Sequence, residues 1–376
     1  MQEKKKILFL AEGQMGDSIC LTPALRAVKN SLPDSHTTIL LFHRRKYTVN
    51  TSVAENTSIE KSNYEGTAEI FKDNRDVDEV LEFDRKAMRE LKGFKRLSAE
   101  IKCIRFLRKQ KYDAVICTFP QNRFVIWSFL AGIKIRIGEK GQKFETLLTD
   151  RPEISRGDNG VLNYFCDLLK PLGITSNDKK TYFKVPPESI EFAKRKLEPL
   201  NISTEKKLLI IHPGASDKDR QWPQKKFTEL INYIKANNSI EILIAYSEYD
   251  EEYINELNEL SRNSLKSVET EKISDLAGLL KLADISIVHN SGPRHLAAAV
   301  GTKTIGLLEK YDDIMWKIYD DINKHAIIQS VKNCEACKEG KCLGIIPASE
   351  KFGARCMHDI EAKEVYSLVE RIINNP

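Results

Sequence analysis

Short apolar segments and amphipathic segments alternate along both halves of the sequence, and this alternation restricts the fold more than any other feature. In the first half, the segments that we interpret as strands are KILFLA, TTILLF, VDEVLEF, YDAVICTF and IRIG. In the second half, they are LLIIHPG, EILIAY, DISIVHN and TKTIGLL. Helix-forming segments separate them, which is typical of parallel sheets flanked by helices.

A charged segment with two adjacent prolines, DKKTYFKVPPESIEFAKRKLEPLNISTEKK, lies between the halves and predicts a linker that leads into a short helix. A chain of 376 residues is long enough for two domains. We therefore predict two Rossmann-like, doubly wound α/β domains, residues 1–180 and 181–376, facing each other across a cleft. Sheets of this kind bind ligands beyond the carboxyl ends of their strands.

The composition is that of an ordinary globular protein, with 41% hydrophobic and 30% charged residues. A formal charge of +5 favours anionic partners but falls short of the basic footprint of a nucleic-acid-binding protein. No apolar run reaches the length of a membrane span, and the N-terminal run is too short for a signal peptide. These features predict a cytoplasmic protein and leave open a peripheral contact with the inner face of the membrane.

The segment 91–111 predicts an amphipathic helix with many basic residues. The apolar residues with helical spacing are Leu91, Phe94, Leu97, Ile101, Ile104 and Leu107. The basic residues are Lys92, Lys95, Arg96, Lys102, Arg105, Arg108, Lys109 and Lys111, with Glu100 as the single acid. Two interpretations fit this pattern: a solvated face opposite a core stripe, or a surface for a phosphorylated glycolipid or anionic lipid.

The loop after the first predicted strand, GQMGDSICLTPAL (13–25), contains an acid, Asp17, where a bound phosphate would be repelled. One interpretation is that Asp17 caps a helix that begins at Ser18. Gly13 and Gly16 would let the backbone turn sharply and let a substrate approach closely. Pro23 lies further along the same segment and would break a helical hydrogen bond, so the helix is either bent or starts late.

Three motifs, in this order, resemble those of glycosyltransferase family 9, the bacterial heptosyltransferase-like enzymes. They are GDSICLTPALRAVKNSLPDS (16–35), LLIIHPGASDKDRQWPQKKF (208–227) and ADISIVHNSGPRHLAAAVGTKTIGLL (283–308). The resemblance implies the B-type glycosyltransferase fold, with acceptor binding in the N-terminal domain and nucleotide-sugar binding in the C-terminal domain. It also implies transfer of a heptose-like sugar from ADP-heptose to a lipopolysaccharide core or related saccharide, with inversion and without a catalytic metal or other cofactor.

The resemblance gives Asp17 a chemical role, because this residue matches the family's general base. A sugar hydroxyl is a poor nucleophile until its proton has an acceptor, and a carboxylate at this position would provide one. Helix capping remains the alternative.

The predicted donor site lies in the second half. HNSGPRH stands between a strand and a helix, so amides near Ser291 and Gly292 would face a diphosphate at the positive helix end, with His295 in the first turn. Arg220 would bind phosphate with paired donors, or else form a surface ion pair with Asp217 or Asp219. Asp250 would hold ribose hydroxyls, or else belong to an exposed helix start.

Two departures from the family pattern concern this donor site. Asn290 stands where the family usually has an aspartate, which removes a negative charge beside the predicted diphosphate. After TKTIGLL, the sequence EKYDDIMW replaces the family's common glycine and Pro-Thr-Asp-Pro-like turn. Both departures bear on the identity of the nucleotide and the sugar.

Eight cysteines are present, and half of them cluster near the C-terminus. Cys334, Cys337, Cys342 and Cys356 could form a tetrahedral thiolate site for zinc or iron, or be reduced or partly paired thiols. Cys20, Cys103, Cys117 and Cys166 lie in apolar settings that predict core positions.

The expected partners are a nucleotide sugar and a lipid-linked saccharide, with oligomerisation left open. One alternative is a protein O-heptosyltransferase or another nucleotide-sugar transferase of the same fold, which would glycosylate a protein acceptor. A second alternative belongs to another class, a nucleic-acid-binding module that uses the basic helix and the cysteine-rich tail. The alternating strands and helices of both halves argue against it.

Overall fold

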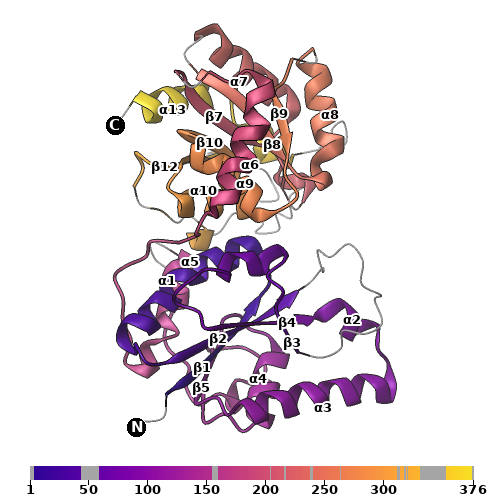
Figure 1. The fold of residues 1–376 in the computed structure, drawn as a ribbon, viewed down its shortest axis with the longest axis vertical. Coiled ribbons are helices and arrows are strands. Elements are labelled where there is room, and N and C mark those ends of the chain that lie inside the picture. Colours follow the sequence, from indigo (N-terminus) through magenta and orange to yellow (C-terminus); the bar gives the residue numbers. More distant parts are fainter. Residues whose placement is uncertain are drawn as a thin grey trace. The chain divides into compact units, whose positions relative to one another are not determined.

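The computed structural model describes residues 4–43, 59–154, 160–203, 205–215, 217–237, 240–262, 264–310, 314–316, 319, 321–330 and 353–374. The chain forms two compact units, Met1–Lys184 and Val185–Pro376, which we call the N-unit and the C-unit. Figure 1 shows that a sheet with helices packed around it makes up each unit.

The N-unit sheet has the strand order β3-β4-β2-β1-β5-β6. Its strands are β1 (Lys6–Glu12), β2 (His36–His43), β3 (Glu60–Lys61), β4 (Glu79–Asp84), β5 (Ala114–Cys117) and β6 (Ile135–Ile137). All neighbouring strands are parallel except β3 and β4. The order reverses at β1, which pairs with β2 on one side and with β5 on the other. The carboxyl ends of β1 and β5 therefore flank a topological switch point, where such sheets bind ligands.

The helices of the N-unit are α1 (Met15–Ser31), α2 (Arg85–Glu90), α3 (Gly93–Gln110), α4 (Asn122–Leu130) and α5 (Gly160–Asp167). Short 3₁₀ turns span Gly66–Phe71, Glu145–Leu147 and Lys170–Leu172.

Helix α1 continues through Pro23 instead of starting late. Pro23 cannot donate to the carbonyl of Ile19, and the Thr22 hydroxyl donates to that carbonyl at 2.7 Å instead. The Tyr182 amide in turn donates to Thr22 Oγ1 at 3.0 Å. The proline is therefore tolerated because a neighbouring side chain replaces the missing donor.

The C-unit sheet has the order β12-β11-β10-β7-β8-β9, and all neighbouring strands are parallel. Its strands are β7 (Lys207–His212), β8 (Ile240–Tyr246), β9 (Ser267–Glu269), β10 (Ile285–His289), β11 (Lys303–Leu308) and β12 (His325–Gln329). Here the order reverses at β7, which lies between β8 and β10. The switch point of this unit is at the carboxyl ends of β7 and β10.

The helices of the C-unit are α6 (Pro187–Leu197), α7 (Gln224–Asn237), α8 (Glu251–Leu260), α9 (Ile273–Leu282), α10 (Gly292–Val300), α12 (Arg355–His358) and α13 (Ala362–Asn374). Short 3₁₀ turns span Glu198–Leu200, Lys218–Arg220, Glu248–Asp250 and Ile314–Trp316.

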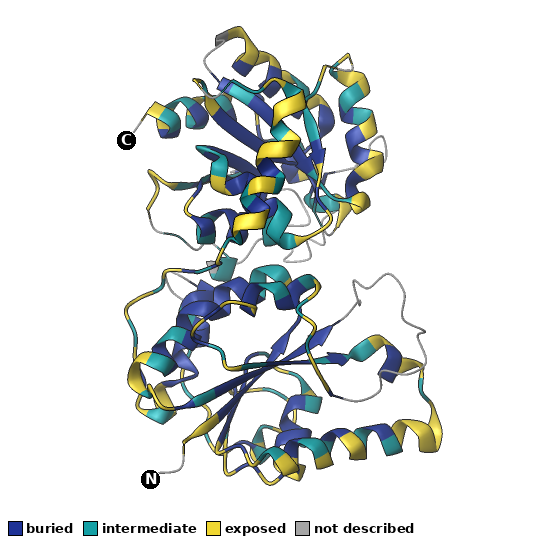
Figure 2. Cartoon of the chain, in the orientation of Figure 1, coloured by how far each residue is buried: buried dark blue, intermediate teal, exposed yellow. Residues whose placement is uncertain are grey.

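The central strands of both sheets are buried on both faces over most of their length, as the apolar runs in the sequence predict (Figure 2). The edge strands β3, β6, β9 and β12 contain exposed residues. The cysteines predicted as core residues, Cys20, Cys103, Cys117 and Cys166, are all buried. Burial raises the pKa of the Cys103 and Cys117 thiols to about 12, so both remain protonated near neutral pH.

Helix α3 corrects one sequence-based expectation. Its buried residues are Ala99, Cys103 and Leu107, and Ile104 and Phe106 pack partly against the same core. Of the predicted core stripe, Leu91, Ile104 and Leu107 therefore meet the core, whereas Phe94, Leu97 and Ile101 are exposed. Their spacing satisfies a helical period, but the period alone does not identify the face that meets the sheet. The end of α3 nearest α2 is drawn as exposed in Figure 2.

Candidate active site

Asp17 lies in the first turn of α1, directly after the loop that follows β1, and its side chain is half-buried. The N-cap residue of α1 is Gln14, because the helix begins at Met15 rather than at Ser18. The structure therefore does not make Asp17 the N-cap residue. An acid in the first turn still interacts favourably with the helix dipole.

The loop before Asp17 approaches β2 closely. The amide of Gly13 donates to the Phe42 carbonyl at 3.0 Å. A Cβ atom at Gly13 would lie only 2.7 Å from Nδ1 of His43, so a side chain there would displace the histidine. Gly13 thus allows a close approach, as the sequence predicts, but the group that approaches is His43.

A buried polar cluster at the carboxyl ends of the N-unit strands was not predicted from the sequence. The Glu12 carboxylate is 3.0 Å from Arg85 Nη1, and it accepts hydrogen bonds from Gln121 at 2.7 Å and Gln14 at 3.3 Å. Glu12 ends β1 and Gln121 follows β5, so the cluster lies at the switch point of the N-unit. The only signal in the sequence is the polar residue at the end of each apolar strand.

A second polar group, an acid–histidine pair, lies on the neighbouring strands β2 and β4 of the same sheet. His43, the last residue of β2, has its Nε2 atom 3.6 Å from a carboxylate oxygen of Glu82 in β4. Glu82 also accepts a hydrogen bond from the Ser62 hydroxyl. Polar groups from four strands or their following loops therefore converge near the loop that leads into Asp17.

In the C-unit, the structure brings Arg220 and the turn before α10 together, although 70 residues separate them in the sequence. Arg220 Nη1 donates to the Asn290 carbonyl at 3.3 Å. Ser291 is the N-cap residue of α10, and its own amide donates to the His289 carbonyl at 2.8 Å. The first amide of the helix is that of Gly292. Both this amide and the Arg220 guanidinium are predicted to bind an anion, and both lie beside the carboxyl ends of β7 and β10, the switch point of the sheet.

A buried carboxylate accompanies Arg220. Oε1 of Glu309 lies 3.6 Å from Arg220 Nε, and the Glu309 side chain is fully buried at the end of β11. Arg220 itself remains 30% exposed and also lies 3.9 Å from Asp217, the surface partner that the sequence suggested. Glu309 is the first residue of the EKYDDIMW segment, which departs from the family pattern.

Asn290 connects two cations. Its carbonyl accepts from Arg220, while its side-chain oxygen accepts from Arg294 Nη1 at 3.0 Å. Arg294 is fully buried, and it also donates to the Trp316 carbonyl at 2.8 Å. A Cβ atom at Gly306 would lie 2.9 Å from Arg294 Nε, so the glycine makes space for this arginine. The side chain of Asn290 therefore points toward the buried arginine.

His295 is in the first turn of α10, as predicted, but its side chain is buried. Its Nδ1 atom is 3.1 Å from the Tyr319 hydroxyl. Burial, together with the charge of Arg294, lowers the pKa of His295 to about 3, so the ring is neutral at physiological pH. The structure places His295 as a neutral, packed residue and not as a cation that faces solvent.

His289 at the end of β10 is also neutral. Its Nε2 atom accepts a hydrogen bond from the Trp222 amide at 2.7 Å, which leaves the proton on Nδ1, 3.3 Å from the Gly214 carbonyl. Burial lowers the pKa of His289 to about 3. Through these two hydrogen bonds, His289 connects the end of β10 to the loop after β7, the loop that contains Arg220.

Asp250 is buried beside the same loop. Its carboxylate accepts from the Ser247 amide at 3.1 Å and from the Ser247 hydroxyl at 2.7 Å, forming a capping box. A Cβ atom at Gly214 would lie 2.2 Å from the Asp250 carboxylate, so only glycine fits there. Asp250 thus packs against the backbone of the HPG loop, and its predicted contact with ribose remains a prediction.

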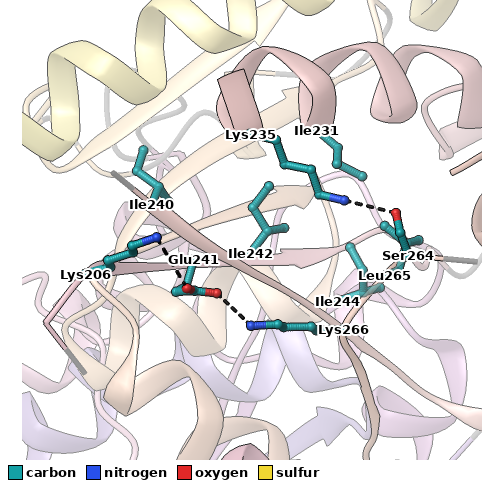
Figure 3. A pocket seen from close by; sticks show the side chains of 10 residues that line it. All are labelled: Lys206, Ile231, Lys235, Ile240, Glu241, Ile242, Ile244, Ser264, Leu265 and Lys266. Carbon is teal, nitrogen blue, oxygen red and sulfur yellow. Dashed lines mark hydrogen bonds and ion pairs between the residues drawn. The ribbon is translucent and has the colours of Figure 1, made fainter. Parts of the chain in front are cut away.

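A surface pocket of about 240 Å³ lies at the opposite end of the C-unit sheet (Figure 3). Its lysines are held by neighbours: Lys206 and Lys266 pair with Glu241, and Lys235 donates to Ser264 at 3.0 Å. It is lined by residues at the amino ends of β8 and β9 and therefore lies away from the switch point. We assign no function to it.

The predicted cysteine cluster falls mostly outside the described residues, which include Cys356 but not Cys334, Cys337 or Cys342. Cys356 is buried in the C-unit core, and its sulfur accepts a hydrogen bond from the Lys310 amide at 3.4 Å. Within the described part of the chain, no three histidine, cysteine or acidic side chains are grouped as metal ligands. In the same part, no helix combines the length and apolarity that a bilayer span requires.

Two doubly wound sheets, each with polar groups at its switch point, define the fold of the B-type glycosyltransferases. The structure resembles that of a family 9 glycosyl transferase from Veillonella parvula DSM 2008, with a TM-score of 0.74, 17% identity and coverage of 100% of this chain and 99% of the other. It also resembles the Escherichia coli heptosyltransferase WaaC solved with ADP, with a TM-score of 0.66, 17% identity and coverage of 98% and 99%.

Sequence comparison identifies the family. The sequence model of glycosyltransferase family 9 (heptosyltransferase) matches residues 101–344, and the protein belongs to this family. Lipopolysaccharide heptosyltransferase 3 of Escherichia coli is 23% identical over 310 residues, which cover 80% of this chain and 83% of that relative. The protein is therefore a heptosyltransferase-like glycosyltransferase.

Proposed function

We propose that the protein transfers a heptose-like sugar from ADP-heptose to a lipopolysaccharide core or related lipid-linked saccharide. The observation that carries this proposal is the contact between Arg220 and the turn before α10, at the switch point of the C-unit. A guanidinium beside the positive end of a helix suits a diphosphate. The similarity to a heptosyltransferase solved with ADP supports adenine as the base.

In the proposed donor site, Arg220 and the Gly292 amide bind the diphosphate. Asn290 and Glu309 position the Arg220 side chain: its Nη1 atom donates to the Asn290 carbonyl at 3.3 Å, and its Nε atom lies 3.6 Å from the Glu309 carboxylate. His289 and His295 support the turn as neutral groups. Asp250 would approach the ribose from the loop side, with its own position fixed by Ser247.

Asp17 is the proposed general base. The acceptor hydroxyl gives its proton to the Asp17 carboxylate as its oxygen forms a bond to the anomeric carbon. The bond between that carbon and the diphosphate oxygen breaks on the opposite face, so ADP leaves and the configuration inverts. This step needs no cofactor, because the leaving charge is received by Arg220 and the amide at the start of α10.

A screen of nucleotide sugars by thermal shift tests the proposal. ADP sugars should raise the melting temperature, since a ligand at 100 times its dissociation constant stabilises by about 2.7 kcal/mol. UDP, GDP and CMP sugars at the same concentration should produce little change. Stabilisation by one of these sugars and not by an ADP sugar would contradict the proposed donor. Transfer of labelled heptose to a protein, and not to a lipid-linked saccharide, would favour the protein O-heptosyltransferase alternative.

The four tail cysteines are proposed to hold one zinc or iron ion with a structural role. Four thiolates suit a closed tetrahedral site, and an amide that donates to a cysteine sulfur, as Lys310 does to Cys356, is a common partner of a metal-bound thiolate. Elemental analysis of the purified protein should give about one metal per chain. Full activity without any metal would leave the cysteines as packing residues.

A further inference from the structure

The outward face of α3 carries large apolar side chains that the fold of the N-unit does not bury. Phe94 is 83% exposed, Leu97 is 56% exposed and Ile101 is 38% exposed. They project opposite the core contacts of Ala99, Cys103 and Leu107, as their helical spacing requires. We call this surface the α3 face: Phe94, Leu97, Ile101, Arg105 and Arg108.

Single exposed apolar residues are common, but several on one helical face mark an interaction surface. The apolar surface continues at the end of α4, where Phe129 is 45% exposed and Leu130 is 43% exposed. Arg108 joins the two parts, because its Nη2 atom donates to the Leu130 carbonyl at 2.6 Å. Figure 1 shows α3 at the periphery of its unit, beside α4.

The charge of the same segment indicates the partner. Residues 92–111 contain eight basic residues and one acid, so this segment alone exceeds the +5 charge of the whole chain. The acid, Glu100, is bound on the inner side by Arg123 at 3.0 Å and by the Trp127 indole at 2.5 Å. The outward side therefore presents apolar groups surrounded by cations.

We propose that the α3 face docks on an anionic lipid bilayer, with Phe94, Leu97 and Ile101 inserted at the level of the acyl chains. An interfacial helix of this kind lies in the plane of the membrane, its apolar face about 5–10 Å deep and its cations at the lipid phosphates. A nucleic acid would neutralise the cations but would leave the apolar side chains in water. The proposal deepens the proposed function, since it would bring the enzyme to the surface that carries a lipid-linked acceptor.

Vesicle flotation with the full chain tests this assignment. The protein should float with vesicles that contain phosphatidylglycerol and remain in the soluble fraction with pure phosphatidylcholine. Added salt should weaken the binding, because the Debye length falls to about 10 Å at 0.1 M salt. Attraction between the exposed basic side chains and the anionic lipid surface is then largely screened beyond that distance. The variant Phe94→Ser/Leu97→Ser should lose at least about tenfold in vesicle affinity, since it removes most of the buried apolar area.

A matched control is Ile322→Ser in the C-unit, where the side chain is 61% exposed and lies outside the α3 face. It should bind vesicles as the unaltered protein does. Both variants should keep the melting temperature and the affinity for ADP measured by calorimetry, which separates this proposal from the donor site. Equal vesicle binding by Phe94→Ser/Leu97→Ser, or capture of RNA in place of vesicles, would overturn the proposal.

Discussion

Arg220 Nε and Glu309 Oε1 lie 3.6 Å apart, with the carboxylate fully buried and the guanidinium 30% exposed. The pair joins the loop after β7 to the end of β11, on either side of the turn that begins α10. Arg220 is thus held by a buried carboxylate, while the exposed part of its guanidinium remains accessible to a ligand. This arrangement explains how a flexible side chain could be fixed in a donor site before the donor binds.

Arg220→Ala should weaken ADP binding by roughly 1.5–3 kcal/mol, the usual value of a charge-assisted hydrogen bond. The same change should also lower stability, because it deprives the buried Glu309 carboxylate of a cation. The double variant Arg220→Ala/Glu309→Gln should recover stability but not ADP affinity. Calorimetry and thermal unfolding on the three proteins separate the two effects, and unchanged ADP affinity in Arg220→Ala would remove Arg220 from the site.

Asn290→Ala should destabilise the C-unit by about 1–3 kcal/mol, since the buried Arg294 loses its side-chain acceptor at 3.0 Å. Asn290→Asp keeps that acceptor and should keep the stability. The new carboxylate would face the buried Arg294, and the family usually has an aspartate at this position, so ADP affinity should also stay close to that of the unaltered protein. Unchanged stability of Asn290→Ala would contradict this role of the Asn290 side chain.

Stability should fall in acid because of the buried histidines of the C-unit. Burial lowers the pKa of His289 and His295 to about 3, from 6.5 for an ordinary histidine. Between about pH 3 and pH 6.5 the unfolded chain binds protons that the folded chain does not. The contribution of these neutral histidines to the free energy of unfolding is therefore fully present above pH 6.5 and is lost as the pH falls toward 3. Each histidine contributes at most about 1.4 kcal/mol per pH unit in this window.

Calorimetric unfolding at several pH values below 6.5 checks this expectation. The variant His295→Asn should show a shallower decline of its melting temperature with falling pH, whatever its melting temperature at neutral pH. A decline with the same slope in both proteins would show that His295 does not remain neutral when buried.

The sequence predicts the doubly wound fold because the central strands are buried on both faces and therefore form continuous apolar runs that alternate with helical segments. It also predicts that Arg220 and the 291–295 turn hold one diphosphate, since both follow strands of one parallel sheet. The structure brings Arg220 to the start of this turn, and the diphosphate itself remains a prediction. The sequence does not predict the cluster of Glu12, Arg85 and Gln121, because these residues meet only through the order and register of the strands.

Two local features could not be decided from the sequence. Pro23 left open whether the first helix is bent or starts late, and the late start is excluded because the Thr22 hydroxyl replaces the donor that Pro23 lacks, a contact that depends on the folded helix. The apolar stripe of α3 fits a helical period, but only part of it meets the core. In the structure, smaller residues such as Ala99 meet the sheet while Phe94 points outward.

The central claim is that Asp17 is the general base, and Asp17→Asn tests it most directly. Asparagine keeps the shape and hydrogen-bonding reach of the side chain, and Gln14, not Asp17, occupies the N-cap position of α1. Turnover should therefore fall by about 10²–10⁴, the usual contribution of a general base, while ADP affinity and melting temperature stay nearly constant. Asp34→Asn, an exposed acid beyond the end of α1, is the control and should turn over normally. Near-normal turnover of Asp17→Asn with the true acceptor would contradict the account and leave this carboxylate with a structural role.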